Sequence, residues 1–233
     1  MFKVSKTKIK NLLIVDGKQY KDSRGYLREL LSEKEIHSKF KFTIVSKSKK
    51  NVLRGLHFQY NKPQGKYISV LKGRILDVVV DLRKKSKTFK KSFSIILSEK
   101  NCKSIYIPPG FAHGFQTLDK ENIVCYSCTE YRSSGDEHAL IYNDPQLKIK
   151  WFSNKPIMTK KDKKAKTSPK EVSILLVENN KEDIQLITKY INQSDRLNAT
   201  IQTVDSIKKA KTVMFYQEID ILPSSTQSHQ KNC

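Results

Sequence analysis

Between residues 42 and 131 the sequence is a succession of short β-rich runs with no helical pattern between them. We expect strands at residues 42–45, 67–71, 75–82, 93–97, 104–107, 114–118 and 123–129. Turn residues or charges separate the runs, as at Lys72-Gly73-Arg74 and Pro108-Pro109-Gly110. Closely spaced short strands without intervening helices are typical of a β sandwich or barrel rather than of a βαβ sheet.

The segments that flank this region have other patterns. Residues 12–15 predict one more strand, followed by a turn at Asp16-Gly17. A short helix is expected within residues 30–40, where Ser32 and Glu35 have the spacing of a capping box. Residues 155–170 contain seven lysines and two prolines, a composition that indicates a linker or a tail lying over the β domain.

The C-terminal part has an α/β rhythm. We expect a strand at residues 172–180, an amphipathic helix at 181–193, a strand at 199–204 and a second helix at 206–217. Residues 174–183 resemble the opening of a response-regulator receiver domain, but Glu178 alone stands for its acidic cluster and no phosphoacceptor strand follows. The expected domains are therefore a jelly roll at 1–154, a linker or tail at 155–170, a truncated receiver-like segment at 171–222 and a disordered tail at 223–233.

The composition excludes several classes of function. The formal net charge is +22, but the lysines are scattered and no recognition motif accompanies them, so we expect no nucleic-acid partner. No run approaches the roughly 20 apolar residues of a membrane span, and the N-terminus lacks a signal core, which predicts a cytoplasmic protein. Cys125 and Cys128 point to opposite faces of an expected strand and lack a second ligand pair, which argues against zinc.

Three stretches concentrate the chemistry: Arg54-Gly55-Leu56-His57-Phe58-Gln59 with Gln64-Gly65-Lys66, Ile107-Pro108-Pro109-Gly110-Phe111-Ala112-His113-Gly114-Phe115, and Tyr126. Together they supply a guanidinium, two imidazoles, amides, an ammonium and a phenol. Such groups suit the binding of an anion and the transfer of a proton beside it, because histidine titrates near neutral pH. We interpret the three stretches as one active site.

The spacing Pro108-x-Gly110-x-x-His113 resembles the second half of the cupin signature. The first half, which supplies a His-x-His pair and a Glu in metal-binding cupins, is reduced here to His57-Phe58-Gln59. Two histidines on separate strands are too few for a metal that needs three or four ligands. We therefore expect a cupin-type jelly-roll pocket with no metal and no other cofactor.

Taken together, the motifs resemble the dTDP-4-dehydrorhamnose 3,5-epimerase family over about residues 8–165. They are the stretches given above with Asp77-Val78-Val79-Val80-Asp81-Leu82-Arg83 and Asn143-Asp144-Pro145 to Trp151. The resemblance implies a jelly-roll homodimer that epimerises C3 and C5 of a 4-keto-6-deoxyhexose carried on dTDP. It implies His57 as the base, Tyr126 as the acid on the opposite ring face, Lys66 as the cation beside the enolate and Asp162 as the partner that orients His57.

The same resemblance implies a set of substrate-binding residues: Arg24, Glu29, Arg54, Gln59, Gln64, Asp77, His113 and Tyr131. Tyr131-Arg132 stands where the family has an aromatic pair. Two alternatives remain open at this stage. One is a 3-epimerase or ketoisomerase acting on another nucleotide sugar, and the other is a non-catalytic cupin that binds a sugar nucleotide and is fused to a signalling remnant.

Overall fold

The computed structural model describes residues 3–168, 170–193, 197–207 and 209–210. The chain divides after Thr167 into two units, which are described separately. Within the described residues, no helix is both long and apolar enough to cross a membrane.

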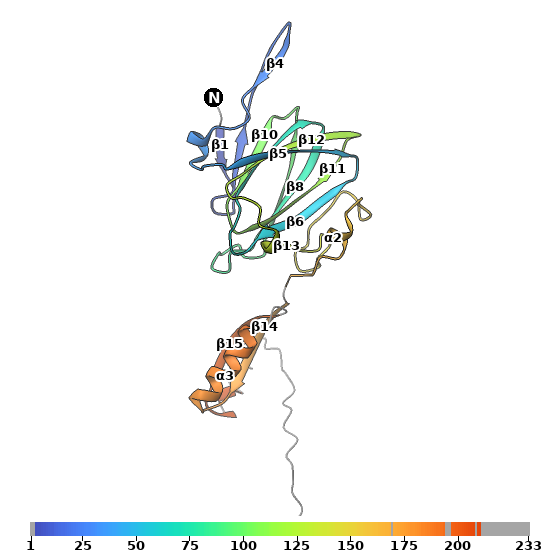
Figure 1. Cartoon of the computed structure of the whole chain (residues 1–233). Helices are drawn as coiled ribbons and strands as arrows, with labels where there is room; N and C mark the ends of the chain where they lie inside the picture. The colour runs from blue at the N-terminus through green and yellow to red at the C-terminus, as the bar shows by residue number, and fades with distance from the viewer. Residues whose placement is uncertain (1–2, 169, 194–196, 208, 211–233) are drawn as a thin grey trace, which may run out of the picture. The chain divides into compact units, whose positions relative to one another are not determined.

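The first unit is a sandwich of two antiparallel sheets (Figure 1). The six-stranded sheet has the order β1 (Lys3–Lys6), β2 (Leu13–Asp16), β10 (Lys103–Ile107), β7 (Lys66–Lys72), β12 (Glu121–Cys128) and β5 (Phe42–Lys49). The five-stranded sheet has the order β13 (Glu137–Ala139), β6 (Leu53–Gln59), β11 (Phe111–Thr117), β8 (Arg74–Asp81) and β9 (Ser92–Ser98). The prediction of a mainly β fold is confirmed.

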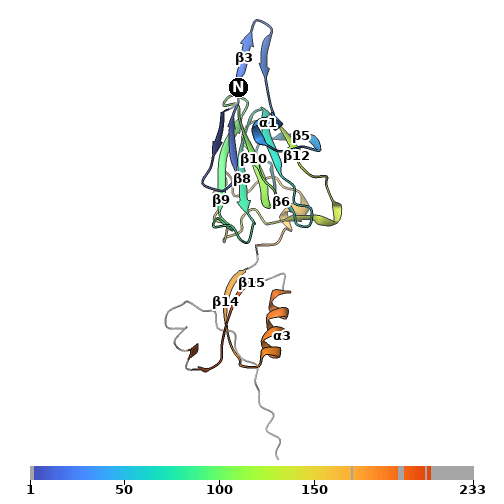
Figure 2. The ribbon, with the colours of Figure 1, turned by 90° about the vertical axis from the view of Figure 1, so that its left-hand side faces the viewer.

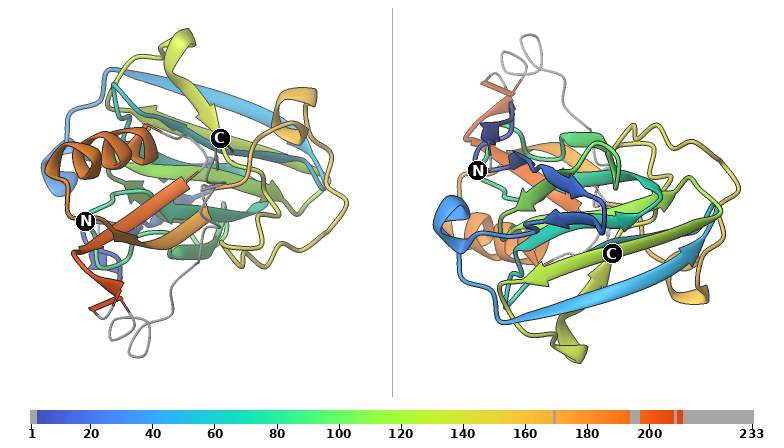
Figure 3. Two further views of the ribbon diagram at one scale, coloured as in Figure 1. Left: turned by 90° about the horizontal axis from the view of Figure 1, so that it is seen from below. Right: turned by 90° about the horizontal axis from the view of Figure 1, so that it is seen from above.

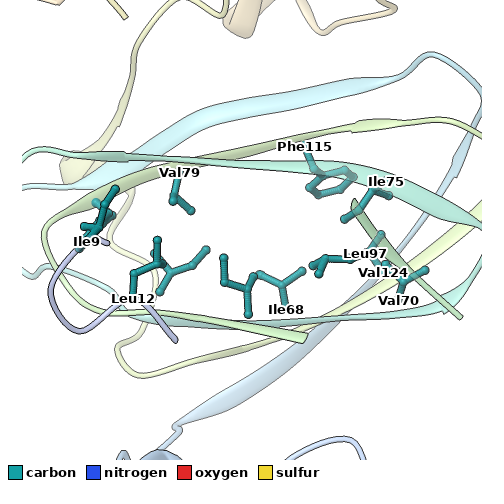
Figure 4. Close-up of a cluster of buried hydrophobic side chains, with 12 residues drawn as sticks. Ile9, Leu12, Ile68, Val70, Ile75, Val79, Leu97, Phe115 and Val124 are labelled. Atoms are coloured by element: carbon teal, nitrogen blue, oxygen red, sulfur yellow. The ribbon is translucent and has the colours of Figure 1, made fainter. Parts of the chain in front are cut away.

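The main core fills the space between the two sheets (Figure 4). Ile68, Val70 and Val124 come from the six-stranded sheet and meet Ile75, Val79 and Phe115 from the five-stranded sheet. Burial of each such side chain contributes about 1.5–3 kcal/mol. The alternate residues of β8, such as Val78, pack on the other side of the sheet against a second cluster, so both faces of this strand are covered. This double burial explains the continuous apolar run in the sequence.

The short helix predicted within residues 30–40 is present, but its predicted cap is not. Helix α1 covers only Glu33–Ile36, and Ser32 occupies its N-cap position without a side-chain cap hydrogen bond. The predicted capping box of Ser32 and Glu35 is therefore wrong. The Glu33 carboxylate instead accepts a hydrogen bond from the Phe40 amide at 3.0 Å, which ties this single turn to the chain that follows.

A two-stranded hairpin, β3 (Gln19–Asp22) and β4 (Gly25–Arg28), projects from the sandwich (Figures 1 and 2). Its apolar side chains face solvent in this chain: Tyr26 is 56% exposed and Leu27 is 74% exposed. Arg28 anchors the base of the hairpin by donating to the carbonyl oxygens of Val70 and Cys102 at 3.0 and 2.9 Å.

Residues 155–167, expected to form a linker or a tail, lie against the sandwich. Ile157 forms a parallel β-bridge with Val52, and the Ile157 carbonyl accepts a hydrogen bond from the Leu53 amide at 2.9 Å. The short helix α2 (Lys160–Lys163) follows and contacts β6. This segment thereby brings its polar side chains to the strand that carries His57.

In the second unit, β14 (Lys170–Val177) and β15 (Leu197–Val204) are parallel and are joined by helix α3 (Lys181–Asn192) (Figures 2 and 3). The predicted order of strand, helix and strand is confirmed. The Asn180 side chain caps α3 by accepting from the Glu182 amide at 2.9 Å. Most of the predicted second helix, and the whole predicted tail at 223–233, lie outside the described residues.

Candidate active site

A cavity of about 340 Å³ lies between the two sheets of the first unit. His57 and His113 reach it from the five-stranded sheet, whereas Lys66 and Tyr126 reach it from the six-stranded sheet. Its lining residues are Ile44, Arg54, His57, Phe58, Gln59, Gln64, Lys66, His113, Phe115, Tyr126, Cys128, Arg132, Glu137, Thr159, Lys161 and Asp162. A ligand in this cavity would therefore have an imidazole on one side and a phenol on the other.

His57 is bound to a carboxylate. Its Nε2 lies 2.6 Å from Oδ1 of Asp162, whose side chain is only 4% exposed. Thr159, the N-cap of α2, fixes Asp162 by accepting a hydrogen bond from its amide at 3.2 Å. Burial alone would raise the pKa of Asp162, but the hydrogen bond and charge of His57 bring it below its usual value. The carboxylate stays ionised. When the His57 ring is neutral, this favours a proton on Nε2, so that Nδ1 is the nitrogen with a lone pair.

Two glycines allow the strands that carry the histidines to approach each other. Gly55 has φ +120°, and a Cβ on it would lie 2.5 Å from the Gly114 Cα. A Cβ on Gly114 would in turn lie 2.7 Å from the Arg54 carbonyl oxygen. Side chains at either position would push β6 and β11 apart. The bare backbones let His57 pair directly with His113 across the two strands.

His113 forms a second imidazole–carboxylate pair. Its Nε2 lies 2.8 Å from Oδ2 of Asp77, and both side chains are buried. Asp77 is on β8, one strand further from the cavity than His113. The carboxylate thus orients the ring, while the ring itself faces the cavity.

The cations of the cavity differ in their partners. Arg54 is held by the Ser48 hydroxyl, to which its Nε donates at 3.2 Å. Lys66 has no hydrogen bond or ion pair with any residue that the structure describes, and burial lowers the pKa of its ammonium group. Gln64, a neutral side chain of the same cavity, donates to the Glu130 carbonyl at 2.5 Å. An ammonium group in the cavity with no ion-pair partner among the described residues attracts negative charge on a ligand.

Within the described part of the chain, no three His, Cys, Asp or Glu side chains gather closely enough to hold a metal ion. Each cavity histidine is instead paired with one carboxylate. Cys102, Cys125 and Cys128 are free thiols. The arrangement suits acid–base chemistry on an anionic ligand.

Comparison with known proteins agrees with this chemistry. A family model described as dTDP-4-dehydrorhamnose 3,5-epimerase matches residues 6–169. The chain belongs to this epimerase family. The dTDP-4-dehydrorhamnose 3,5-epimerase of Salmonella typhimurium is 41% identical over 170 residues, which are 70% of this chain and 93% of the relative.

Solved structures of epimerases share the fold. The dTDP-6-deoxy-D-glucose-3,5-epimerase of Legionella pneumophila, in complex with dTDP-4-keto-L-rhamnose, matches with a TM-score of 0.69 at 38% identity. The match covers 72% of this chain and 93% of that one. The dTDP-4-dehydrorhamnose 3,5-epimerase of Bacillus anthracis, with TDP and pyrophosphate bound, also has a TM-score of 0.69, at 37% identity, and covers 72% of this chain and 99% of that one.

Most of the residues predicted from the resemblance to the epimerase family line one cavity. They are His57, Lys66, Tyr126, Asp162, Arg54, Gln59, Gln64 and His113. The amide of Gln59 is already occupied, because its Nε2 donates to the carbonyls of Lys62 and Tyr131 at 2.8 and 3.2 Å. The Gln59 side chain therefore links the loops that contain Lys62 and Tyr131.

Four of the predicted residues lie outside the cavity of this chain. Asp77 acts through His113. Tyr131 is 60% exposed and stacks on Phe42 with ring centroids 5.8 Å apart. Arg24 and Glu29 are exposed and belong to the projecting hairpin and the chain just after it, and Arg24 is paired with Asp22 at 2.6 Å.

Three charged residues of the cavity were not among the predicted site residues: Arg132, Glu137 and Lys161. Glu137 accepts hydrogen bonds from Arg132 Nε at 2.8 Å and from Lys161 Nζ at 3.2 Å. It reaches the site because β13 pairs with β6, opposite Gln59. No local sequence pattern marks that pairing, so Glu137 could not be found from the sequence. Arg132 did have a signal, because it replaces one residue of the family's aromatic pair.

Proposed function

We propose that this chain is a cytoplasmic isomerase that converts dTDP-4-dehydro-6-deoxyglucose to dTDP-4-dehydrorhamnose by inverting C3 and C5. One observation carries the proposal: His57 and Tyr126 line a single cavity from opposite sheets. Inversion of a carbon needs a base on one face of the sugar ring and an acid on the other. A cavity lined by an imidazole and a phenol from facing walls meets that need.

The first step is the removal of a proton next to the ketone. Nδ1 of His57 takes the proton from C3, and the C–H electron pair moves into the ring to form an enolate with the charge on the C4 oxygen. The Asp162 carboxylate on Nε2 stabilises the imidazolium that results. The Lys66 ammonium, which has no carboxylate partner among the described residues, stabilises the enolate oxygen.

The second step returns a proton on the other face. The Tyr126 phenol donates to C3, which inverts the centre and leaves a phenolate and an imidazolium. Solvent takes the proton of His57 and restores the proton of Tyr126, and the same cycle at C5 completes the reaction. A positioned acid or base typically contributes about 10²–10⁴-fold to the rate.

The nucleotide would lie at the cationic end of the cavity. The relatives from Legionella and Bacillus were solved with dTDP-linked sugar and with TDP and pyrophosphate. Arg54 and Gln64 line the cavity of this chain, and a guanidinium suits bidentate contact with phosphate.

We further propose that the enzyme works as a homodimer. The hairpin β3–β4 exposes Tyr20, Tyr26 and Leu27, and an isolated two-stranded hairpin is marginally stable in water. A second copy would cover these side chains and bring Arg24 and Glu29 within reach of a cavity. Light scattering of the wild type should give the dimer mass and Leu27→Asp the monomer mass. A monomeric wild type with full activity would exclude the dimer.

The second unit is, in our proposal, a remnant of a receiver domain without phosphorelay activity. Its parallel β14–α3–β15 unit supports this view, as does Glu178 at the end of β14. The Glu178 carboxylate, however, accepts from the Asn179 and Asn180 amides and so serves its own loop. Incubation with acetyl phosphate and Mg²⁺ should leave the chain unphosphorylated, and an acid-labile phosphoaspartate within residues 171–222 would contradict the proposal.

The experiment that tests the catalytic proposal is solvent exchange. In D₂O the wild type should introduce deuterium at C3 and C5 of dTDP-4-dehydro-6-deoxyglucose, and His57→Ala should not. Exchange at C3 alone would indicate a 3-epimerase. Tight binding without any exchange would indicate a non-catalytic sugar-nucleotide-binding protein.

A further inference from the structure

Arg132 has a position in the cavity that the proposed acid–base chemistry does not use. It lies in the loop between β12 and β13 and lines the cavity. Its Nε donates to Oε1 of Glu137 at 2.8 Å, and its two Nη groups have no partner among the residues that the structure describes. The carboxylate thus holds the guanidinium through Nε and leaves the two Nη groups, with four N–H donors, free for a ligand.

The chain holds Arg132 on both sides. The Gln59 side chain, which is buried, donates to the carbonyl of Tyr131 at 3.2 Å and accepts from the amide of Ser133 at 3.3 Å. The Tyr131 ring is further fixed by its stack on Phe42. Because both neighbours are tied down, little backbone freedom remains to be lost when the guanidinium binds a ligand.

The charge of the cavity favours an anion. Four cationic side chains and two carboxylates line it. The pKa of Glu137 is held below its usual value, first by the hydrogen bond from Arg132, so the pair stays ionised near neutral pH. Burial lowers the pKa of Lys66, and the positive charge of Arg132 lowers it further, so the two cations lie within electrostatic reach of each other. The diphosphate ester of a nucleotide sugar carries about two negative charges, which match this excess.

We infer that Arg132 is a substrate-binding residue whose free Nη groups bind the diphosphate of the nucleotide sugar. Glu137 and Gln59 are its positioning residues. The inference rests on the proposed function for the identity of the substrate. A planar guanidinium with a free edge binds two phosphate oxygens at once, whereas an aromatic ring at this position could only stack.

Binding to the full chain tests the inference without turnover. Calorimetry would compare dTDP, inorganic pyrophosphate and thymidine on the wild type, Arg132→Met, Arg132→Lys and the control Arg74→Met. Arg74 is also an ion-paired surface arginine, bound to Asp119, but it lies outside the cavity, so its loss lowers the net charge equally.

We expect Arg132→Met to weaken dTDP and pyrophosphate by about tenfold or more, since hydrogen bonds to charged groups are worth about 1.5–3 kcal/mol. Thymidine should bind as to the wild type, Arg132→Lys should be intermediate and Arg74→Met should stay within about twofold. In turnover, the loss in kcat/KM should lie in KM. Weakening of dTDP without weakening of pyrophosphate would place the contact on the base and overturn the assignment to the diphosphate.

Unchanged dTDP binding in Arg132→Met, or a fall in kcat at constant KM, would also overturn the inference. These results are distinguishable from a failure of the proposed function. A wild type that binds dTDP through Arg132 but exchanges no deuterium would refute the epimerase mechanism alone. A wild type that turns over, with an Arg132→Met variant that binds dTDP normally, would refute the inference alone.

Discussion

Replacement of Asp162 by asparagine should separate the orientation of His57 from its presence. The carboxylate lies 2.6 Å from His57 Nε2 and its side chain is 4% exposed, so solvent screens the contact little. Asparagine keeps the shape but loses the charge that stabilises the imidazolium formed by proton abstraction. A hydrogen bond to a charged group is worth about 1.5–3 kcal/mol, and each 1.36 kcal/mol is a factor of ten in rate. We therefore expect kcat to fall by about 10- to 150-fold.

The assay is the initial rate of deuterium incorporation at C3, followed by NMR at saturating substrate. Circular dichroism and the melting temperature would establish that Asp162→Asn is folded. Asp119→Asn is a matched control, because it removes a carboxylate that pairs with Arg74 outside the cavity. A rate for Asp162→Asn within about threefold of the wild type would refute the view that the carboxylate assists His57.

Three other changes test the account at separate points. Lys66→Met should lower the exchange rate by about 10²–10³-fold. It should also raise the melting temperature at pH 7, because it removes a half-buried ammonium whose lowered pKa reflects a destabilised charged form. Burial acts to raise the pKa of Asp81, but its hydrogen bonds lower the pKa from 3.8 to about 2. The ionised carboxylate therefore contributes about 2 kcal/mol to the free energy of unfolding above pH 4, and this contribution is lost as the pH falls towards 2. Urea unfolding of Asp81→Asn should lack that part of the acid sensitivity. Gly55→Ala should destabilise the fold by several kcal/mol, because its Cβ would lie 2.5 Å from the Gly114 Cα. Gly25→Ala is the control, since Gly25 also has a positive φ but a Cβ there would have no atom within 4 Å. It should cost only about 1–3 kcal/mol of backbone strain.

Eight strands of the sandwich, β2, β5 and β7 to β12, could be predicted because each is a short local pattern between turn residues, whereas β1, β6 and β13 were not among the expected runs. Their ends were less certain, as β5 continues to Lys49 and β11 begins at Phe111. The pairing of β13 with β6 left no local signal, since it joins segments far apart in the sequence. The position of Glu137 at the cavity follows from that pairing and could be found only in the structure.

The site residues likewise divide into those that a local sequence pattern reveals and those that it does not. His57 and Lys66 stand out because rare chemical groups cluster in one stretch, and Asp162 was found only through resemblance to the family. Asp162 lies in a lysine-rich segment whose composition alone indicates a solvated tail. What places this segment on the sandwich is the backbone bridge between Ile157 and Val52, which involves no characteristic side chain.

The central claim is that the base and the acid act from opposite walls of one cavity. The most direct measurement follows both deuterium content and configuration at C3 in D₂O with the wild type, His57→Ala and Tyr126→Phe. We expect exchange with inversion in the wild type, no exchange in His57→Ala, and exchange without inversion in Tyr126→Phe, because His57 can return the proton only to the face from which it came. Normal inversion by Tyr126→Phe, or wild-type exchange by His57→Ala, would contradict the account.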